Sequence, residues 1–214
     1  MENYKQKFIK LSLEIGALKF GEFQLKSGRI SPYFFNMGLF SSGPLIKNIG
    51  DFYAAALVSS NINYDIVFGP AYKGIPIVTA LASSLSTSYQ LDKPFVYNRK
   101  EVKNHGEGGV TVGEELRGNV VIVDDVITAG TAIREAVDII NNAGATTTGI
   151  VISLDRQERG VGDLSAAKEI SNTLNIPVIS IVNLDEVIDY IDNNPSDYGQ
   201  HIDKIKKYRE EYGA

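Results

Sequence analysis

The sequence predicts an α/β fold: a doubly wound, mainly parallel five-stranded sheet flanked by helices, with a small N-terminal element added to it. Short runs rich in valine and isoleucine are apolar on both faces, as is typical of buried parallel strands. Amphipathic helical patterns lie between these runs, and this alternation indicates a doubly wound sheet. The first 40 residues instead combine one helical pattern with stretches punctuated by glycine and proline.

The strands are expected at residues 65–69, 95–99, 120–124, 148–154 and 177–182. The spacing of apolar residues places helices at 45–59, 75–85, 132–142 and 164–174. An open sheet of this kind binds ligands beyond the carboxyl ends of its strands, where loops and helix N-termini converge. The functional site is therefore expected at that edge of the sheet.

The N-terminal element begins with an amphipathic helix that is expected to end near Gly16 or Gly21. Its apolar residues recur at steps of three and four: Tyr4, Phe8, Leu11, Ile15 and Leu18. Residues 21–38 have no clean period, and their glycines and proline predict short strands and turns. At the other end, the charged stretch 201–214 predicts a solvated helix whose role is packing.

The length of 214 residues favours one domain, 1–214, with the N-terminal element at 1–40, the core sheet at 61–185 and a mobile loop at 98–118. The net charge of −5 argues against broad nucleic-acid binding, because that requires a positive surface. It leaves room for an anionic small molecule held by a local cluster of donors.

The chain is also expected to be cytoplasmic and to have no membrane partner. It contains no cysteine, so it has no thiolate metal site and is compatible with a reducing cytosol. Lysines and a glutamate interrupt the apolar residues of its N-terminus, unlike the core of a signal peptide. No segment approaches the ~18 apolar residues of a spanning helix.

Two carboxylates stand at the end of a buried strand in the segment VVIVDDVITAGTA, residues 120–132. Crowding Asp124 and Asp125 there raises at least one pKa unless donors or a cation compensate, so a structural role alone explains them poorly. A helix-capping loop with acids near the positive end of the helix dipole is the simpler alternative. The functional hypothesis assigns the loop amides, the hydroxyls of Thr128 and Thr131 and the helix N-terminus to a phosphate.

In that hypothesis Gly130 lets the backbone approach the phosphate closely. The carboxylates would repel a phosphate but can accept hydrogen bonds from two sugar hydroxyls, so the pattern indicates a ribose 5-phosphate. The segment is neither a P-loop nor a dinucleotide fingerprint, because it contains neither Gly-Lys-Ser/Thr nor GxGxxG.

This segment resembles the phosphoribosyl diphosphate (PRPP) signature of the type I phosphoribosyltransferases. The resemblance implies that Asp124 and Asp125 bind the ribose hydroxyls and that residues 128–132 cradle the 5-phosphate. The loop residues implied in PRPP binding are Val126, Ile127, Thr128, Ala129, Gly130, Thr131 and Ala132.

A second anion site is indicated by FGPAYKGIP, residues 68–76, which follows the first core strand and ends at a helix start. In isolation an ordinary strand-to-helix turn with a solvated lysine explains it better, whereas together with the acidic loop the anion site is favoured. In the family that the chain resembles, this turn holds the diphosphate, often with a cis peptide, and the matching residues are Tyr72 and Lys73.

The polar, glycine-rich segment 98–118 has the composition of a mobile loop and carries four cationic or titratable residues: Arg99, Lys100, Lys103 and His105. It is either a solvated hairpin tip or a lid that closes cations over a leaving diphosphate and excludes water. It resembles the catalytic loop of the orotate phosphoribosyltransferases. That resemblance implies a homodimer in which the loop reaches the neighbouring subunit's site.

Residues 20–38, FGEFQLKSGRISPYFFNMG, resemble the N-terminal hood of the same family. Alone, Phe34 and Phe35 are better explained as core residues, and Arg156 as a surface salt bridge. Beside Lys26, the two rings could stack on a flat anionic pyrimidine, and Arg156 could bind its carboxylate. The resemblance implies these orotate contacts: Lys26, Phe34, Phe35, Thr128 and Arg156.

The resemblance implies transfer of ribose 5-phosphate from PRPP to orotate, with Mg²⁺ held by substrate and water near the two aspartates and with no direct protein ligand. The implied catalytic residues are Lys73, Lys103, His105, Asp124 and Asp125. The implied PRPP contacts outside the acidic loop are Lys26, Tyr72, Lys73, Arg99, Lys100, Lys103 and His105. Three alternatives remain open: another phosphoribosyltransferase with a purine or uracil acceptor, a PRPP-binding regulator, and a structural α/β domain.

Overall fold

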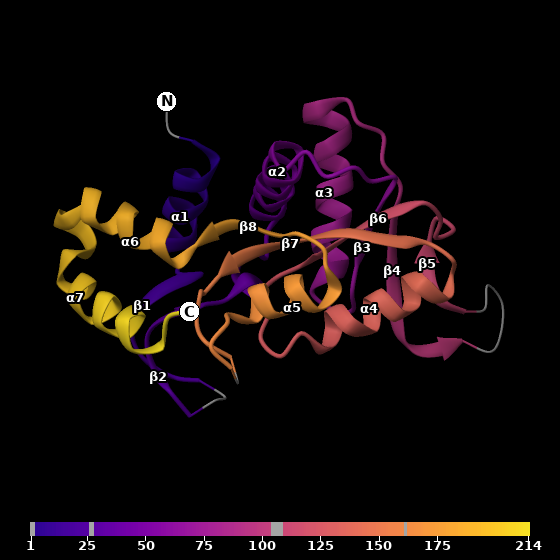
Figure 1. Cartoon of the computed structure of the whole chain (residues 1–214). Helices are drawn as coiled ribbons and strands as arrows, with labels where there is room; N and C mark the ends of the chain where they lie inside the picture. Colours follow the sequence, from indigo (N-terminus) through magenta and orange to yellow (C-terminus); the bar gives the residue numbers. More distant parts are fainter. Residues whose placement is uncertain (1–2, 26–27, 104–108, 161) are drawn as a thin grey trace.

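The computed structural model describes residues 3–25, 28–103, 109–160 and 162–214, apart from the side chains of residues 102, 103, 196 and 197. Its centre is a six-stranded sheet, drawn across the middle of Figure 1. The strands are β3 (Ile66–Gly69), β4 (Phe95–Lys103), β5 (Gly109–Gly113), β6 (Asn119–Asp124), β7 (Thr146–Asp155) and β8 (Val178–Asn183).

The order across the sheet is β5-β4-β3-β6-β7-β8. All five predicted strands are present and parallel, while β5 runs antiparallel to β4 at one edge. From β3 the chain first adds β4 on one side and then β6 on the other, so the topological switch lies between β3 and β6. The carboxyl ends of these two strands therefore flank the crevice where an open sheet binds its ligand.

Helices cover both faces of the sheet (Figure 1). The helices α2 (Gly43–Ser59) and α3 (Gly74–Tyr89) pack on one face, and α4 (Thr131–Asn142) and α5 (Ala166–Leu174) pack on the other. Strand β6 shows why its sequence is apolar throughout, since Val121 and Val123 join the first core while Val120 and Ile122 join the second. The prediction of a buried, doubly wound sheet is confirmed.

The N-terminal element consists of α1 (Tyr4–Glu14) and an antiparallel pair, β1 (Leu18–Gln24) and β2 (Ile30–Phe35). Helix α1 ends near Gly16, the earlier of the two predicted positions, because Gly16 takes a left-handed φ of 70° that stops the helix. Leu18 therefore belongs to β1 and not to the helix. A short 3-10 turn, η1 (Met37–Leu39), leads from β2 toward α2.

Two further helices, α6 (Leu184–Asn193) and α7 (Pro195–Tyr212), follow β8, and α7 lies beside β1 and β2 (Figure 1). The sequence analysis predicted a solvated helix at 201–214 and did not predict α6. Helix α7 starts earlier and is not solvated all round, because Ile205 and Tyr208 are buried. Its predicted packing role is confirmed. None of the described helices is both long and apolar enough to cross a membrane.

The expectation of five strands was one short. Strand β5 lies within the segment predicted as a loop, and it pairs only with β4. As a half-exposed edge strand it does not need apolar residues on both faces, so its sequence lacks the pattern by which the other strands were recognised.

Candidate functional site

Two turns meet at the switch point between β3 and β6. The Nζ atom of Lys73, at the start of α3, donates to Oδ2 of Asp125, just beyond β6, at 2.6 Å. Lys73 is exposed, whereas the side chain of Asp125 is only 14% exposed. The structure thus brings together two clusters that are about 50 residues apart in sequence and places both at the predicted edge of the sheet.

The turn between β3 and α3 is fixed by a hydrogen bond to a buried side chain and by close packing of the backbone. The backbone N–H of Ala71 donates to Oδ1 of the buried Asn98 at 2.8 Å, and the peptide bond between Ala71 and Tyr72 is cis, as the resemblance implied. A Cβ atom on Gly69 would lie 2.2 Å from the carbonyl oxygen of Gly74, so strand and helix meet too closely for any side chain. Tyr72 and Lys73 are left exposed above this packed base.

The acidic loop is anchored by donors from neighbouring elements. The Tyr53 hydroxyl, on α2, donates to the carbonyl oxygen of Asp124 at 2.7 Å. The N–H of Ser153, on β7, donates to the carbonyl oxygen of Asp125 at 2.9 Å, and the hydroxyl of Ser153 donates to the same oxygen. These bonds fix the backbone from which the two carboxylates project.

Asp124 is buried, with 9% of the residue exposed. Burial, and then the nearby charge of Asp125, raises its pKa from 3.8 to about 7, although a hydrogen bond from the Asp125 N–H opposes the shift. The expected crowding of the two acids is therefore present. The raised pKa shows that a carboxylate at this position is costly without a compensating cation or hydrogen-bond donors.

The loop then opens into the start of α4. Thr128, Ala129 and Thr131 are exposed, and Gly130 adopts a left-handed φ of 71° at the N-cap. No side chain in the described ranges caps α4. The carboxylates of Asp124 and Asp125 accept from amides of their own loop, so the helix-capping alternative finds no support in these contacts. A helix N-terminus without a side-chain cap is what an anion site there requires, and anion binding by this loop stays a prediction.

Arg156 lies just beyond β7, at the same edge of the sheet. Its Nε and Nη2 atoms donate to Oε1 of Glu158 at 3.0 and 2.6 Å, and Nη2 also donates to the hydroxyl of Ser31 at 3.1 Å. The guanidinium lies 4.3 Å from the ring centre of Tyr33. With its side chain 17% exposed, Arg156 forms a largely buried ion pair and not the surface salt bridge of the simpler interpretation.

Phe34 and Phe35 are not brought together by β2. Phe34 is 41% exposed and stacks on Phe23 at 5.5 Å between ring centres. Phe35 packs against the first core and lies 6.0 Å from Phe8. Adjacent residues of a strand point to opposite faces, so only Phe34 offers an exposed ring, as a pair with Phe23.

Two predicted site residues, Lys26 of the hood and His105 of the lid, lie outside the described residues. The rest of the lid is described in part. Lys103 ends β4 opposite Gly109, and its side chain is not described. Arg99 donates to the carbonyl oxygen of Gly109 at 3.5 Å, and Lys100 forms an ion pair with Glu135 of α4 at 3.3 Å. The movement of residues 98–118 stays a prediction.

Four residues of the site were missed by the sequence analysis: Tyr53, Asn98, Ser153 and Glu158. Each forms hydrogen bonds or an ion pair with a predicted site residue or its turn. Tyr53, Asn98 and Ser153 lie 27 to 71 residues from their partners in sequence. Glu158 is only two residues from Arg156, but it also accepts from Tyr33, which is 125 residues away.

The hollows of the surface do not all coincide with this site. The larger, about 480 Å³, lies between α1, α2 and α3 and contains no predicted site residue. A smaller apolar hollow of about 160 Å³ includes Lys73 and is lined by Met37, Phe40, Ile46 and Pro76, among others. We assign the site by the strand ends and their polar groups and not by the size of a hollow.

Mg²⁺ prefers oxygen ligands and keeps several of its waters. In the described part of the chain, no group of three or more acidic or histidine residues could hold a metal ion alone. The paired carboxylates of Asp124 and Asp125 supply oxygen atoms beside the expected sugar site. They fit a magnesium ion held mainly by substrate and water.

The fold and the two turns define a phosphoribosyltransferase, and residues 40–185 match the family model described as a phosphoribosyl transferase domain. The chain is 53% identical over 214 residues to the orotate phosphoribosyltransferase of Mannheimia succiniciproducens and 54% identical to that of Marinobacter nauticus, with 100% of each chain covered. The chain belongs to the orotate phosphoribosyltransferase family.

Solved structures agree. The orotate phosphoribosyltransferase of Francisella tularensis is 44% identical, with a TM-score of 0.88 over 97% of this chain and 100% of that one. An adenine phosphoribosyltransferase of Saccharomyces cerevisiae is 22% identical, with a TM-score of 0.56 over 83% of this chain and 98% of that one. At that identity it shows a shared fold alone.

Proposed function

We propose that this enzyme transfers ribose 5-phosphate from PRPP to N1 of orotate in pyrimidine (UMP) biosynthesis. The bond from N1 to the anomeric carbon forms as the bond from that carbon to diphosphate breaks, with inversion and loss of the N1 proton. The products are orotidine 5-phosphate and diphosphate. The observation that carries the proposal is 53% identity over 214 residues to a relative named orotate phosphoribosyltransferase.

The donor is assigned to the two turns at the switch point. The carboxylates of Asp124 and Asp125 accept hydrogen bonds from the ribose hydroxyls, and residues 126–132 surround the 5-phosphate. Lys73 lies 2.6 Å from Asp125, within reach of a diphosphate bound to the same sugar. Tyr72 and Lys73 then contact the leaving group, which agrees with their exposure above the packed turn.

The rate enhancement is assigned mainly to positioning and charge. An oxocarbenium-like sugar and a departing diphosphate need cations around the leaving group and exclusion of water. We assign these tasks to Lys73 and to the cations of the lid: Arg99, Lys100, Lys103 and His105. Lys103 is expected to have the largest single effect.

The acceptor is assigned to the hood and the end of β7. The carboxylate of orotate is bound by Arg156, and the pyrimidine ring lies against Phe34 with Lys26 as a counter-charge. Phe35 and Thr128 complete the proposed contacts. Because Phe35 packs toward Phe8, its contribution is assigned to its backbone and not to its ring.

Mg²⁺ is the proposed cofactor, and when bound it would neutralise charge on the leaving diphosphate. The chain's own contribution is to offer Asp124 and Asp125 to the waters of the ion and to the sugar. We also propose a cytoplasmic location, which the absence of cysteine supports.

We further propose a homodimer in which residues 98–118 reach the partner's site. Mixing Lys103→Ala with Asp125→Asn would then create one intact site in each heterodimer. Activity above that of either variant alone supports sharing, whereas no recovery after verified subunit exchange contradicts it.

The fall in orotate absorbance on addition of PRPP and Mg²⁺ tests the reaction directly. Turnover with orotate, with diphosphate released in equal amount, supports the proposal. Turnover with hypoxanthine or uracil but not with orotate overturns it in favour of another acceptor. A PRPP-binding regulator is the remaining alternative, which salt-dependent RNA binding without orotate turnover would favour.

A further inference from the structure

Arg156 is fixed by groups from two segments, the chain just beyond β7 and strand β2. Both Nε and Nη2 donate to Oε1 of Glu158, at 3.0 and 2.6 Å, and Nη2 also donates to the hydroxyl of Ser31 at 3.1 Å. The hydroxyl of Tyr33 donates to the same Oε1 atom at 2.8 Å, and the guanidinium lies over the Tyr33 ring. Glu158 thus connects the end of the core sheet to strand β2.

This arrangement uses one edge of the guanidinium. Of its five N–H donors, Nε–H and those of Nη2 face Glu158 and Ser31. The two donors of Nη1 have no hydrogen-bond partner among the residues that the structure describes. A side chain held by one edge has lost its rotamer freedom before a ligand arrives, which lowers the entropic cost of binding at the other edge.

The segment that carries Glu158 is itself held by the end of α7. The N–H of Arg159 donates to the carbonyl oxygen of Tyr212 at 2.8 Å, and the N–H of Ala214 donates to that of Gln157 at 2.9 Å. Glu158 and Gly213 form an isolated antiparallel bridge between these bonds. Residues 157–159 therefore have a short β-like pairing with residues 212–214.

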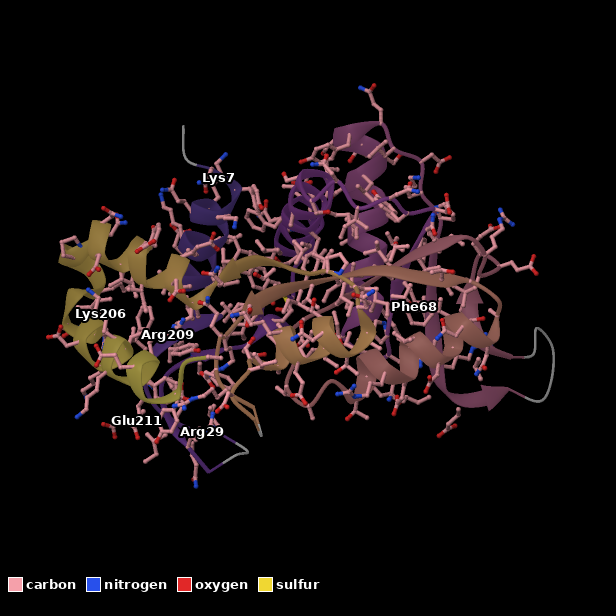
Figure 2. The ribbon with its side chains drawn as sticks, viewed as in Figure 1. Lys7, Arg29, Phe68, Lys206, Arg209 and Glu211 are labelled. Atoms are coloured by element: carbon pink, nitrogen blue, oxygen red, sulfur yellow. The ribbon has the colours of Figure 1, made fainter. Side chains whose placement is uncertain are left out.

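Arg29, in the N-terminal hood, contacts both segments of this pairing. Its Nη1 atom donates to the carbonyl oxygen of Arg159 at 2.9 Å, and its guanidinium lies 4.9 Å from the ring centre of Tyr212. In Figure 2, the labels of Arg29 and Glu211 mark this meeting point at the lower end of α7. Hood, core sheet and α7 all converge on the segment that follows Arg156.

We propose that Glu158 is a positioning residue that aims Arg156 at the orotate carboxylate, and that the end of α7 acts as a strap that holds Glu158 in place. The inference rests on the proposed function, since it names how the acceptor site of that reaction is built. Glu158 does not touch the substrate; it acts through Arg156.

Charge alone would give the opposite result to positioning. Glu158 neutralises Arg156, so a purely electrostatic view expects its removal to strengthen the binding of an anionic acceptor. If Glu158 positions Arg156, removing Glu158 weakens orotate binding, because the guanidinium becomes mobile and the Tyr33 hydroxyl loses its acceptor. The sign of the change in the orotate KM therefore separates the two.

The test compares the KM values for orotate and PRPP in Glu158→Ala, Arg156→Ala and the double variant. Glu158→Ala is expected to raise the orotate KM about tenfold, the size of one lost charge-assisted contact, and to change the PRPP KM less than about twofold. In the Arg156→Ala background it is expected to add less than about twofold, because the two residues act as one unit. Asp192→Asn, which removes a surface ion pair with Lys206, is the matched control.

An unchanged or lowered orotate KM in a folded Glu158→Ala protein overturns the inference, as does full additivity with Arg156→Ala. If that variant does not fold, Tyr33→Phe removes one hydroxyl and is expected to raise the orotate KM about threefold. Tyr212→Ala removes the ring that the Arg29 guanidinium contacts at the end of α7, and it is also expected to raise the orotate KM. Wild-type protein without orotate turnover would defeat the proposed function itself, and with it this inference.

Discussion

Replacing Asp124 with asparagine is expected to stabilise the ligand-free protein at neutral and alkaline pH. The residue is 9% exposed, and burial together with the charge of Asp125 raises the pKa of its carboxyl group from 3.8 to about 7. Asparagine has almost the same shape and can still accept the hydrogen bond from the Asp125 N–H. It removes only the cost of the buried charge.

The sign of the pH dependence follows from the raised pKa. The folded state holds the proton more tightly than the unfolded state, so the stability that this group contributes is complete below about pH 4 and is lost as pH rises through about 7. A shift of about three units at 1.36 kcal/mol per unit sets an upper limit of ~4 kcal/mol. Relaxation and water access make about 1–3 kcal/mol the expected gain in Asp124→Asn at pH 8.

Urea unfolding of the wild type and Asp124→Asn between pH 5 and pH 8, without ligands, measures this gain. The free energy of unfolding of the variant is expected to exceed that of the wild type by an amount that grows with pH and levels off near pH 8. A difference that does not vary with pH would show that Asp124 does not hold its proton more tightly in the folded state. Asp125→Asn is a second check, because removal of the neighbouring charge lowers the pKa of Asp124 and moves the transition to lower pH.

Three further variants test other parts of the account. Gly130→Ala places a side chain at a φ of 71°, with its Cβ atom 2.5 Å from Cδ1 of Ile170. It is expected to lower the free energy of unfolding by about 1–2 kcal/mol and to raise the PRPP KM. An unchanged melting temperature and an unchanged PRPP KM would contradict this. Tyr53→Phe removes the donor to the Asp124 carbonyl oxygen and is expected to cost about 1–2 kcal/mol in urea unfolding, whereas no loss would show that the bond does not anchor the loop. Lys103→Ala is expected to lower turnover by orders of magnitude with an unchanged circular dichroism spectrum, and wild-type turnover would remove Lys103 from the mechanism.

The sheet and the location of the site could be predicted because their signals are local. Residues 120–123 are apolar throughout since alternate side chains enter different cores, and the strand-end rule then directs attention to Asp124. The signal for α6 was also present in the sequence, because Asn183 and Glu186 form a capping box at its start.

The rest depends on contacts between distant segments. Tyr53 lies 71 residues from Asp124 in sequence, and nothing at its position indicates that partner. Glu158 lies only two residues from Arg156, but its sequence position does not indicate that the two side chains meet. Likewise, two adjacent phenylalanines look equivalent until the strand assigns Phe34 to an exposed face and Phe35 to the core. Strand β5 needed a partner strand, and not an apolar sequence, to form.

Separate clusters are proposed to hold the two substrates: the acidic loop with Lys73 holds the donor, and the hood with Arg156 holds the acceptor. Initial rates of orotate consumption with Asp125→Asn and Arg156→Ala, measured against each substrate in turn, test it most directly. Asp125→Asn is expected to raise the PRPP KM about tenfold with little change in the orotate KM, and Arg156→Ala is expected to do the reverse. Equal effects of either variant on both KM values, or an exchange of the two patterns, would contradict it.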